Sequence, residues 1–357
     1  MRSLLSGLCL LLSLTALAQQ PTYQNLVFEG GGVRGIAYGG ALEQLDSLGI
    51  LSPIKRVAGT SAGAIQAALL AVGYTPTEIT EITYATPVQQ FNDGRFIFFG
   101  GTNRLFKQYG WYRGDKFTDW IGKMIEAKTG SPNLTFAQLH ALAGYSNYKD
   151  LYVTGTNLSD QSVMVFSHET FPDMQVKHAV RISMSIPLYY RAVLLDQQGN
   201  IVTKPKKGQE VDVLVDGGIL ANFPLTLFDD PKYLASTSPA QTDYDSQGTF
   251  YNPQTLGLRL DRDEQIAFDK QQAGLAPYNI SKFSDYMGAF YNIVKESLNR
   301  QHIQPHDWTR TISTSTAGFS SKVRKLSEIE KSTLLKSGRN GVQAFINRNQ
   351  APQHEQK

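Results

Sequence analysis

The sequence predicts an α/β fold with a mostly parallel central sheet. Two observations predict it: short apolar runs alternate with stretches of helical apolar spacing, and the first two of these units contain glycine-rich turns. Such alternation is typical of parallel strands connected by helices that cover the sheet. The chain has 357 residues, of which 41% are hydrophobic and 18% charged, which is ordinary for a globular protein with a sizeable core.

The first eighteen residues differ from the rest of the chain. Arg2 precedes a short apolar run that ends in an A-x-A site at residues 16–18, and this combination is typical of a secretory signal peptide. We therefore expect residues 1–18 to be a signal peptide, with an uncleaved membrane anchor as the alternative. The protein would then be exported, to a bacterial periplasm, the outer envelope or the medium. Removing this segment removes Cys9, the single cysteine, so the mature chain would have no disulfide and no thiolate chemistry.

The predicted elements follow in order along the chain. Residues 25–28 form a short apolar strand that stops at three glycines, and a helix of regular apolar spacing then runs to Gly49. A second strand is predicted at residues 54–59, and a helix of small residues at 61–73. Later strands are predicted at residues 150–157, 162–167, 211–218, 255–261 and 310–315, and later helices end near residue 187 or span 283–302 and 326–347.

Two irregular segments interrupt this alternation. Residues 91–121 are rich in aromatic side chains and are the natural place for an apolar groove or a lid, the alternative being that these rings belong to the core. Residues 229–254 are polar and predict a long surface loop. Because strands continue on both sides of that loop, we expect a single domain over residues 19–347, with a motif core at about 26–225 and a disordered tail at 348–357.

Charge and composition exclude several classes of function. The formal net charge is only +3, and lysine and arginine are spread along the chain, so we expect no nucleic-acid surface. No set of histidine, cysteine or carboxylate residues has the spacing of metal ligands. We therefore expect neither a metal ion nor a cofactor.

The stretch "GTSAG" at residues 59–63 is the first candidate for chemistry. It matches G-x-S-x-G, in which the serine occupies a strained turn between a strand and a helix. Gly59 and Gly63 would leave room where a Cβ atom would collide with a neighbouring strand or helix. The N-terminus of the helix favours negative charge developing near Ser61. A plain tight turn is the alternative for this pentapeptide taken alone.

The stretch "GGGVRG" at residues 30–35 has two interpretations. It matches the dinucleotide-binding pattern G-x-G-x-x-G, but that pattern also needs an acidic residue at the end of the second strand, which here ends in Gly59. The other interpretation is an oxyanion hole, in which backbone N–H groups of successive glycines converge on one oxygen atom. Arg34 within this stretch would either attract a lipid phosphate or brace the turn.

A serine nucleophile needs a base, and Asp216 is the best candidate. It begins the stretch "DGG" at residues 216–218, for which a hairpin turn is the alternative, because Asp-Gly between apolar runs is a strong hairpin signal. A carboxylate becomes a stronger base in a dry pocket, so this role predicts a buried Asp216 within hydrogen-bond reach of Ser61. The histidines are poorly placed as partners and are expected at the surface; they are His140, His168, His178, His302, His306 and His354.

These three motifs, in this order, resemble those of the patatin-like phospholipases. The resemblance runs from about Leu26 to Ile346, with an unfamiliar loop at residues 229–254. Softer matches are "RISMSIPLYYRAV" at residues 181–193, "NFP" at residues 222–224 and a closing helix that contains "LSEIEKSTLLKSGRNGVQAF" at residues 326–345.

The resemblance implies a three-layer α/β sandwich and a serine–aspartate dyad. In that scheme Ser61 attacks an ester carbonyl and Asp216 accepts its proton. The backbone N–H groups around residues 30–32, which are Gly30, Gly31 and Gly32, would hold the oxyanion. The residues that would support the motifs are Arg34, Gly35, Gly59, Gly63, Gly217 and Gly218.

The implied function is hydrolysis of lipid acyl esters, of phospholipase A, lysophospholipase or esterase type, without a cofactor. The partner would be a lipid substrate, which the protein would reach by binding peripherally to a membrane or micelle surface. A catalytically silent lipid-binding protein on the same fold is one alternative, and a dinucleotide-binding protein is another. The sequence does not predict the headgroup, the acyl chain, the position cleaved or the oligomeric state.

Overall fold

The computed structural model describes residues 22–350, with gaps at 95–96, 146, 236–242, 246–247, 272–273, 301–302 and 321–322. The predicted signal peptide therefore lies outside the described residues. The predicted tail begins inside them, because the last helix, α10, continues to Gln350. None of the helices in the described part of the chain is long and apolar enough to cross a membrane.

The core of the fold is an eight-stranded sheet with the order β10-β9-β1-β2-β4-β8-β7, in which β5 also pairs with β4. The five strands from β10 to β4 run parallel, and β5, β7 and β8 pair antiparallel with their neighbours. A small second sheet pairs β3 with β6. The strands are β1 (Asn25–Phe28), β2 (Arg56–Gly59), β3 (Gly110–Tyr112), β4 (Asp150–Asn157), β5 (Ser162–Phe166), β6 (Leu188–Tyr190), β7 (Val193–Leu195), β8 (Asp212–Asp216), β9 (Thr255–Asp261) and β10 (Thr311–Ser315).

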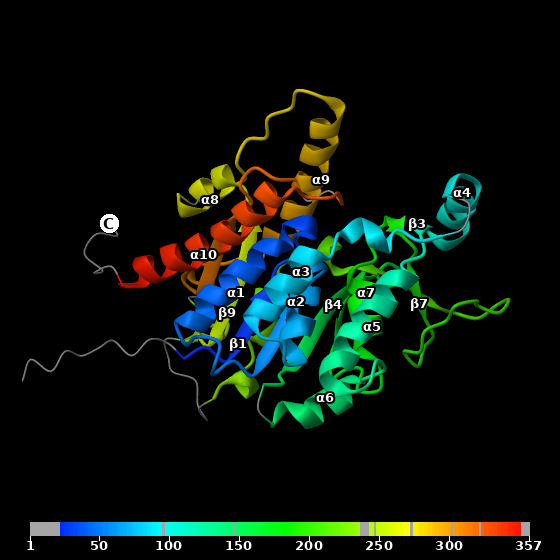
Figure 1. Cartoon of the computed structure of the whole chain (residues 1–357), viewed down its shortest axis with the longest axis horizontal. Helices are drawn as coiled ribbons and strands as arrows, with labels where there is room; N and C mark the ends of the chain where they lie inside the picture. Colours follow the sequence, from blue (N-terminus) through cyan, green and yellow to red (C-terminus); the bar gives the residue numbers. More distant parts are fainter. Residues whose placement is uncertain are drawn as a thin grey trace, which may run out of the picture.

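Helices connect these strands and cover the sheet, and Figure 1 shows α1, α2 and α3 in front of it. The α-helices are α1 (Ala37–Ser47), α2 (Ala62–Ala71), α3 (Pro76–Ala85), α4 (Ile97–Gln108), α5 (Asp115–Thr129), α6 (Phe136–Ala143), α7 (Val176–Ser183), α8 (Asp263–Lys270), α9 (Phe283–Arg300) and α10 (Glu328–Gln350). Short 3₁₀ helices are η1 (Gly32–Ile36), η2 (Val88–Phe91), η3 (Gly217–Ile219), η4 (Leu225–Phe228), η5 (Pro231–Tyr233) and η7 (Pro305–Arg310).

Alternate residues of the central strands face opposite layers, as the period of two in a strand requires. In β1, Leu26 and Phe28 join the main core, whereas Val27 belongs to a second cluster on the other face. That second cluster also contains Phe228 and Tyr233, from η4 and η5. The sheet therefore lies between a thick layer of helices and a thinner layer of short 3₁₀ turns. This confirms the predicted three-layer α/β fold with a mostly parallel sheet.

The two irregular segments contain more structure than their composition predicts. The aromatic segment at residues 91–121 includes α4 and β3. Its rings divide: Phe91 and Phe117 are buried in the core, with ring centroids 5.3 Å apart, whereas Phe106 is 77% exposed. The polar stretch at 229–254 contains η5 in its described part.

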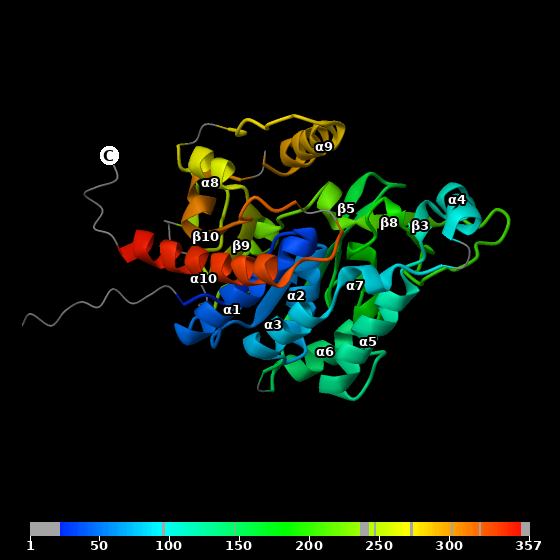
Figure 2. The ribbon, with the colours of Figure 1, turned by 45° about the horizontal axis from the view of Figure 1, so that its top comes forward.

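The closing helix α10 lies directly against α1 (Figure 2). A Cβ atom on Gly338 of α10 would run into the carbonyl oxygen of Ala37, and one on Gly40 of α1 would run into the carbonyl of Leu335. The glycines thus let the two helix backbones touch. The last helix is therefore packed closely beside the residues that follow the glycine loop.

Replacing Gly338 by alanine is expected to destabilise the protein by about 1–3 kcal/mol, because the added methyl group meets backbone that cannot rotate away. Chemical denaturation measures this difference. The matched control is Gly144→Ala at the end of α6, where nothing lies within 4 Å of the added Cβ atom. A Gly338→Ala protein as stable as the wild type would contradict the close packing.

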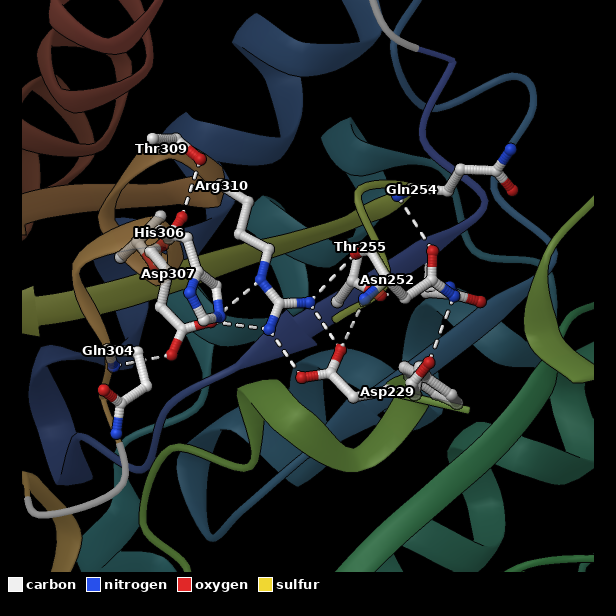
Figure 3. Close-up of polar contacts among 12 residues, drawn as sticks. Asp229, Asn252, Gln254, Thr255, Gln304, His306, Asp307, Thr309 and Arg310 are labelled. Atoms are coloured by element: carbon white, nitrogen blue, oxygen red, sulfur yellow. Dashed lines mark hydrogen bonds and ion pairs between the residues drawn. The ribbon is translucent and has the colours of Figure 1, made fainter. Parts of the chain in front are cut away.

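A buried ion-pair network ties η7 to the segment after η4 (Figure 3). The Arg310 guanidinium donates to both carboxylate oxygens of Asp229, at 2.6 and 2.7 Å, and to Asp307 Oδ1 at 2.6 Å. It also donates to the carbonyl oxygen of Asn252, just before β9. Arg310 is only 3% exposed. Burial alone would lower the pKa of Arg310, but the two aspartates raise it above its usual value.

The C-terminal ends of β1, β2 and β8 lie close together in the sheet. Phe28 of β1 pairs with Gly59 of β2, and Gly59 pairs with Val153 of β4. Asp216, the last residue of β8, pairs with Gly155, two residues farther along β4. The segments that follow β1, β2 and β8 therefore lie side by side, and these carry the three sequence motifs.

Candidate active site

Ser61 lies in the turn between β2 and α2, at the N-cap of the helix. Its backbone angles are φ 52° and ψ −119°, in a region that residues with a Cβ atom rarely occupy. The Ser61 N–H donates to Ser183 Oγ at 2.8 Å, which holds the turn from the outside. This strained strand-to-helix turn is the geometry expected for G-x-S-x-G.

The glycines beside Ser61 allow the turn to fit between its neighbours. A Cβ atom on Gly63 would lie 2.5 Å from the carbonyl oxygen of Phe28 in β1, and one on Gly59 would run into the backbone of Gly63. The helix α2 that follows is buried along nearly its whole length, which explains why it consists mainly of alanine and other small residues.

Asp216 ends β8 and points at Ser61. The Ser61 hydroxyl donates to Asp216 Oδ2 at 2.8 Å, and Asp216 Oδ1 accepts from the N–H of Gly218 at 2.7 Å. The two residues are 7% and 6% exposed. The chain after Asp216 forms the 3₁₀ helix η3 rather than a hairpin, and Gly217 is needed because a Cβ atom there would lie 2.6 Å from the carbonyl oxygen of Thr154.

The segment after α7 contacts both residues. Ser183 accepts the Ser61 N–H, and the carbonyl oxygen of Ser185 accepts the Asp216 N–H at 3.0 Å. Between them, Met184 places its sulfur 3.8 Å from Ser61 Oγ. This explains in physical terms why the "RISMSIP" stretch accompanies the serine and the aspartate.

The glycine loop is fixed by buried hydrogen bonds. Gly30 N–H donates to the carbonyl oxygen of Asn222 at 2.9 Å, and the Asn222 side chain donates to Glu29 Oε1 at 2.8 Å. Glu29 Oε2 in turn accepts the N–H of Leu260 in β9 at 2.8 Å. The N–H of Gly30 is thus already bound to Asn222. Of the three predicted oxyanion donors, this leaves the N–H groups of Gly31 and Gly32 as candidates.

Arg34 braces this loop. Its Nε donates to the carbonyl oxygen of Gly31 at 3.1 Å, within the same turn. This is the structural role that the sequence left open beside lipid phosphate binding. Gly35, three residues after Gly32, allows close packing, because a Cβ atom there would lie 3.0 Å from the Cβ of Ala62 beside the serine.

A mostly apolar cavity of about 330 Å³ opens beside the serine. Its wall includes Ala62 and Met184, which flank Ser61, and Phe91 and Trp120 from the aromatic segment. Arg324, Lys325 and Lys331 are also among the lining residues. Part of the aromatic segment thus forms the wall of this cavity. Within the same segment, the adjacent aromatic side chains of Phe98 and Phe99 lie outside what the structure describes, so a lid there stays a prediction.

The structure places the described histidines away from the serine. In the described part of the chain, the hydrogen-bond partners of the Ser61 hydroxyl are Met184 and Asp216. His178 is half-buried rather than exposed, and desolvation, followed by the charges of Lys177 and Arg181, lowers its pKa to about 4. His302 and His354 lie outside the described residues.

One cluster that the sequence did not predict lies on another part of the sheet. His140, Asp150 and His168 place their ligand atoms within 4.8 Å of one another, although their spacing along the chain matches no metal motif. Only the antiparallel pairing of β4 with β5 brings His168 back to the start of β4. The available signal was the short gap between the two strands predicted at residues 150–157 and 162–167, because a hairpin of these strands places residues just after the second one opposite residue 150.

Comparisons with known proteins agree with this geometry. The sequence profile described as patatin-like phospholipase matches residues 26–229. The uncharacterized protein R571 of Acanthamoeba polyphaga mimivirus is 34% identical over 209 residues, which are 58% of this chain and 62% of that protein. A probable lipid hydrolase, 463L of Invertebrate iridescent virus 6, is 25% identical over 57% of this chain and 63% of its own length. The matched region thus spans less than two thirds of both relatives.

Solved structures share the fold. The crystal structure of VipD from Legionella pneumophila superposes with a TM-score of 0.57 at 14% identity, covering 92% of this chain and 67% of that one. The type III effector protein ExoU gives a TM-score of 0.50 at 18% identity, over 92% of this chain and 53% of its own. At these identities the likeness concerns the fold alone. Because the profile match covers more than half of its residues, the chain belongs to the patatin-like phospholipase family.

Proposed function

We propose that this protein is a lipid acyl hydrolase that cleaves carboxylic esters with Ser61 as nucleophile and Asp216 as base. The observation that carries the proposal is the 2.8 Å hydrogen bond from the Ser61 hydroxyl to the buried Asp216 carboxylate. A serine hydroxyl is barely ionised at neutral pH, so it needs a base in direct contact. Membership of the patatin-like phospholipase family supports the same assignment.

In the proposed reaction, Ser61 Oγ attacks the ester carbonyl while its proton passes to Asp216. The tetrahedral intermediate then collapses, the alcohol leaves with that proton, and an acyl group remains on Ser61. Water attacks the acyl-enzyme by the same route, with Asp216 again accepting a proton, and releases the fatty acid. No step needs a cofactor.

The developing oxyanion would be stabilised by the backbone of the glycine loop. With Gly30 bound to Asn222, the proposed donors are the N–H groups of Gly31 and Gly32. Each such donor contributes about 3–4 kcal/mol to transition-state stabilisation in other hydrolases. The network of Asn222, Glu29 and Leu260 would hold the loop in place before substrate arrives.

The apolar cavity beside Ser61 is the proposed site for the acyl chain. Its wall is made by side chains that flank the serine and by the rings of Phe91 and Trp120. A pocket of this kind recognises hydrocarbon by exclusion of water rather than by specific hydrogen bonds. We extend the proposal to export of the protein and to peripheral contact with a membrane or micelle, which the apolar N-terminal segment and the lipid substrate favour.

Covalent labelling tests the proposal. A fluorophosphonate probe should add one adduct to the wild-type protein and none to Ser61→Ala, as measured by intact mass. His302→Ala, at a histidine that the structure does not place, should label like the wild type. The alternative, a silent lipid-binding protein, predicts no adduct on the wild type although it binds lipid. Loss of labelling in His302→Ala would mean that the base is an imidazole.

A further inference from the structure

Three side chains from different parts of the fold converge at the N-terminal end of β4, whereas Ser61 follows the C-terminal end of the neighbouring strand β2. His140 lies in the last turn of α6, Asp150 is the first residue of β4, and His168 follows β5. His140 Nδ1 lies 2.7 Å and His168 Nδ1 lies 3.7 Å from Asp150 Oδ1. The two imidazole rings stack in parallel, with centroids 3.8 Å apart and 6° between their planes.

Of these two distances, that from His140 is an ordinary hydrogen bond, whereas that from His168 suits a pair of metal ligands. The separation of 3.7 Å between His168 Nδ1 and Asp150 Oδ1 is too long for a hydrogen bond. It is close to the separation of about 3.3 Å between two ligands of one tetrahedral zinc ion, whose bonds are about 2.0–2.1 Å long. One carboxylate oxygen thus faces two imidazole nitrogens, although it has a hydrogen-bonding geometry with only one of them.

Two of the three residues have a backbone that is fixed by the fold. The Asp150 N–H donates to the carbonyl oxygen of Lys55 at 3.0 Å, and β4 pairs with β2. His168 lies in a turn closed by the Phe171 N–H, which donates to the Ser167 carbonyl oxygen at 2.9 Å. The side chains of Asp150 and His168 are 15% and 19% exposed, whereas that of His140 is 53% exposed. Asp150 and His168 therefore stand on fixed backbone, and the exposed His140 leaves the cluster accessible to an ion from solvent.

The side chains in and around the cluster limit which metal ion it can bind. The neighbouring Glu169 is bound by the hydroxyls of Tyr152 and Tyr233 and by Lys232 Nζ, so it is engaged elsewhere. Asp150 supplies a negative charge, and its Oδ1 lies 2.7 Å from His140 Nδ1 and 3.7 Å from His168 Nδ1. Two neutral imidazoles and one carboxylate suit Zn²⁺ and neighbouring transition metals, whereas Ca²⁺ and Mg²⁺ prefer oxygen ligands alone.

We propose that His140, Asp150 and His168 bind one transition-metal ion of the Zn²⁺ class, with water as the fourth ligand. Binding replaces the hydrogen bond between His140 and Asp150, and the proton on His140 Nδ1 leaves to solvent or moves to Nε2. The exposed His140 ring must also turn out of its stack with His168, because a metal ion lies in the plane of each imidazole that binds it. The ion joins α6, β4 and the turn after β5. Asp150 lies five residues before Gly155, the partner of Asp216, so the ion is about 16 Å from the dyad along the strand and stabilises the fold without entering the reaction.

The test uses the full chain, purified without a polyhistidine tag and stripped with a chelator. Calorimetric titration with Zn²⁺ should give one equivalent bound, and Co²⁺ should give the intense visible absorption of a four-coordinate site. His168→Gln and Asp150→Asn should each weaken Zn²⁺ binding at least about tenfold. The matched control is His306→Gln, which removes an imidazole lying 3.5 Å from the single carboxylate of Asp307 and should leave binding unchanged.

Equal Zn²⁺ binding by a His140→Gln, His168→Gln double variant would overturn the site, as would no saturable binding by the wild type. The Co²⁺ spectrum of the wild-type chain decides the matter even where a variant does not fold, because a six-coordinate spectrum like that of aqueous Co²⁺ contradicts the ligand set. Ester hydrolysis should be unchanged by chelation. The outcome is therefore separate from that of the proposed hydrolase.

Discussion

Replacing Asp216 by asparagine is expected to lower kcat/KM for a lipid ester by about 10²–10⁴-fold, the usual contribution of a positioned general base. Asparagine has the same shape and can still accept the Gly218 N–H, but it cannot take the proton that Ser61 donates to Asp216 Oδ2 in the resting protein. The measurement is steady-state hydrolysis of a soluble ester and of a phospholipid in mixed micelles.

The matched control for this prediction is Asp212→Asn, at the first residue of the same strand. It removes the same charge from β8 without touching Ser61, so activity should stay within about twofold of the wild type. An Asp216→Asn protein that keeps full activity would show that the serine has another base. If the Asp216→Asn variant loses both its activity and the circular dichroism spectrum of the folded protein, the role of Asp216 is structural.

Replacing Arg310 by methionine is expected to lower the free energy of unfolding by about 3–5 kcal/mol, because two carboxylates then stay buried without their cation. The side chains of Asp307 and Asp229 are only 1% and 11% exposed, so water cannot replace the guanidinium at little cost. Urea denaturation followed by fluorescence measures the change.

The control for Arg310 is Arg339→Met on α10. Arg339 pairs with Glu43 at the surface, where the two side chains are 44% and 25% exposed, and such pairs contribute about 0–1 kcal/mol. Equal losses in the two variants would contradict the view that burial makes the Arg310 network important. A second comparison, Arg310→Lys, should recover only part of the loss, because an ammonium group cannot bind both carboxylates in the same planar geometry.

The sequence predicted most of the sheet because its strands carry strong local patterns. The strand predictions at residues 150–157 and 255–261 coincide with β4 and β9, both buried along almost their whole length. The small-residue pattern after Ser61 likewise predicts α2, since a helix buried on every side needs small side chains. Segments that pack mainly by shape were harder: the aromatic stretch holds α4 and β3, where composition alone predicted a loop.

The candidate site was predictable only in part, because some of its contacts require particular residue types and others do not. Ser61 and Asp216 lie in motifs whose glycines are required by close backbone contacts, so the two positions can be recognised from the glycine pattern. The hydrogen bond from Gly30 to Asn222 joins backbone atoms of distant segments and therefore requires no particular residue type that the sequence could reveal. His140, Asp150 and His168 meet through the packing of α6 beside β4 and through the register of the β4–β5 pair, neither of which follows from spacing along the chain.

The central place of β1 between β2 and β9 affects how the protein is made. Glu29 and Leu260, whose hydrogen bond secures the glycine loop, are separated by 231 positions in the chain. A ribosome adds residues in order, at about 5–20 per second, so the loop stays unsupported until most of the polypeptide has emerged. The nascent protein therefore passes most of its synthesis with Ser61 already made but without the hydrogen bond from Leu260 to Glu29 that holds the glycine loop.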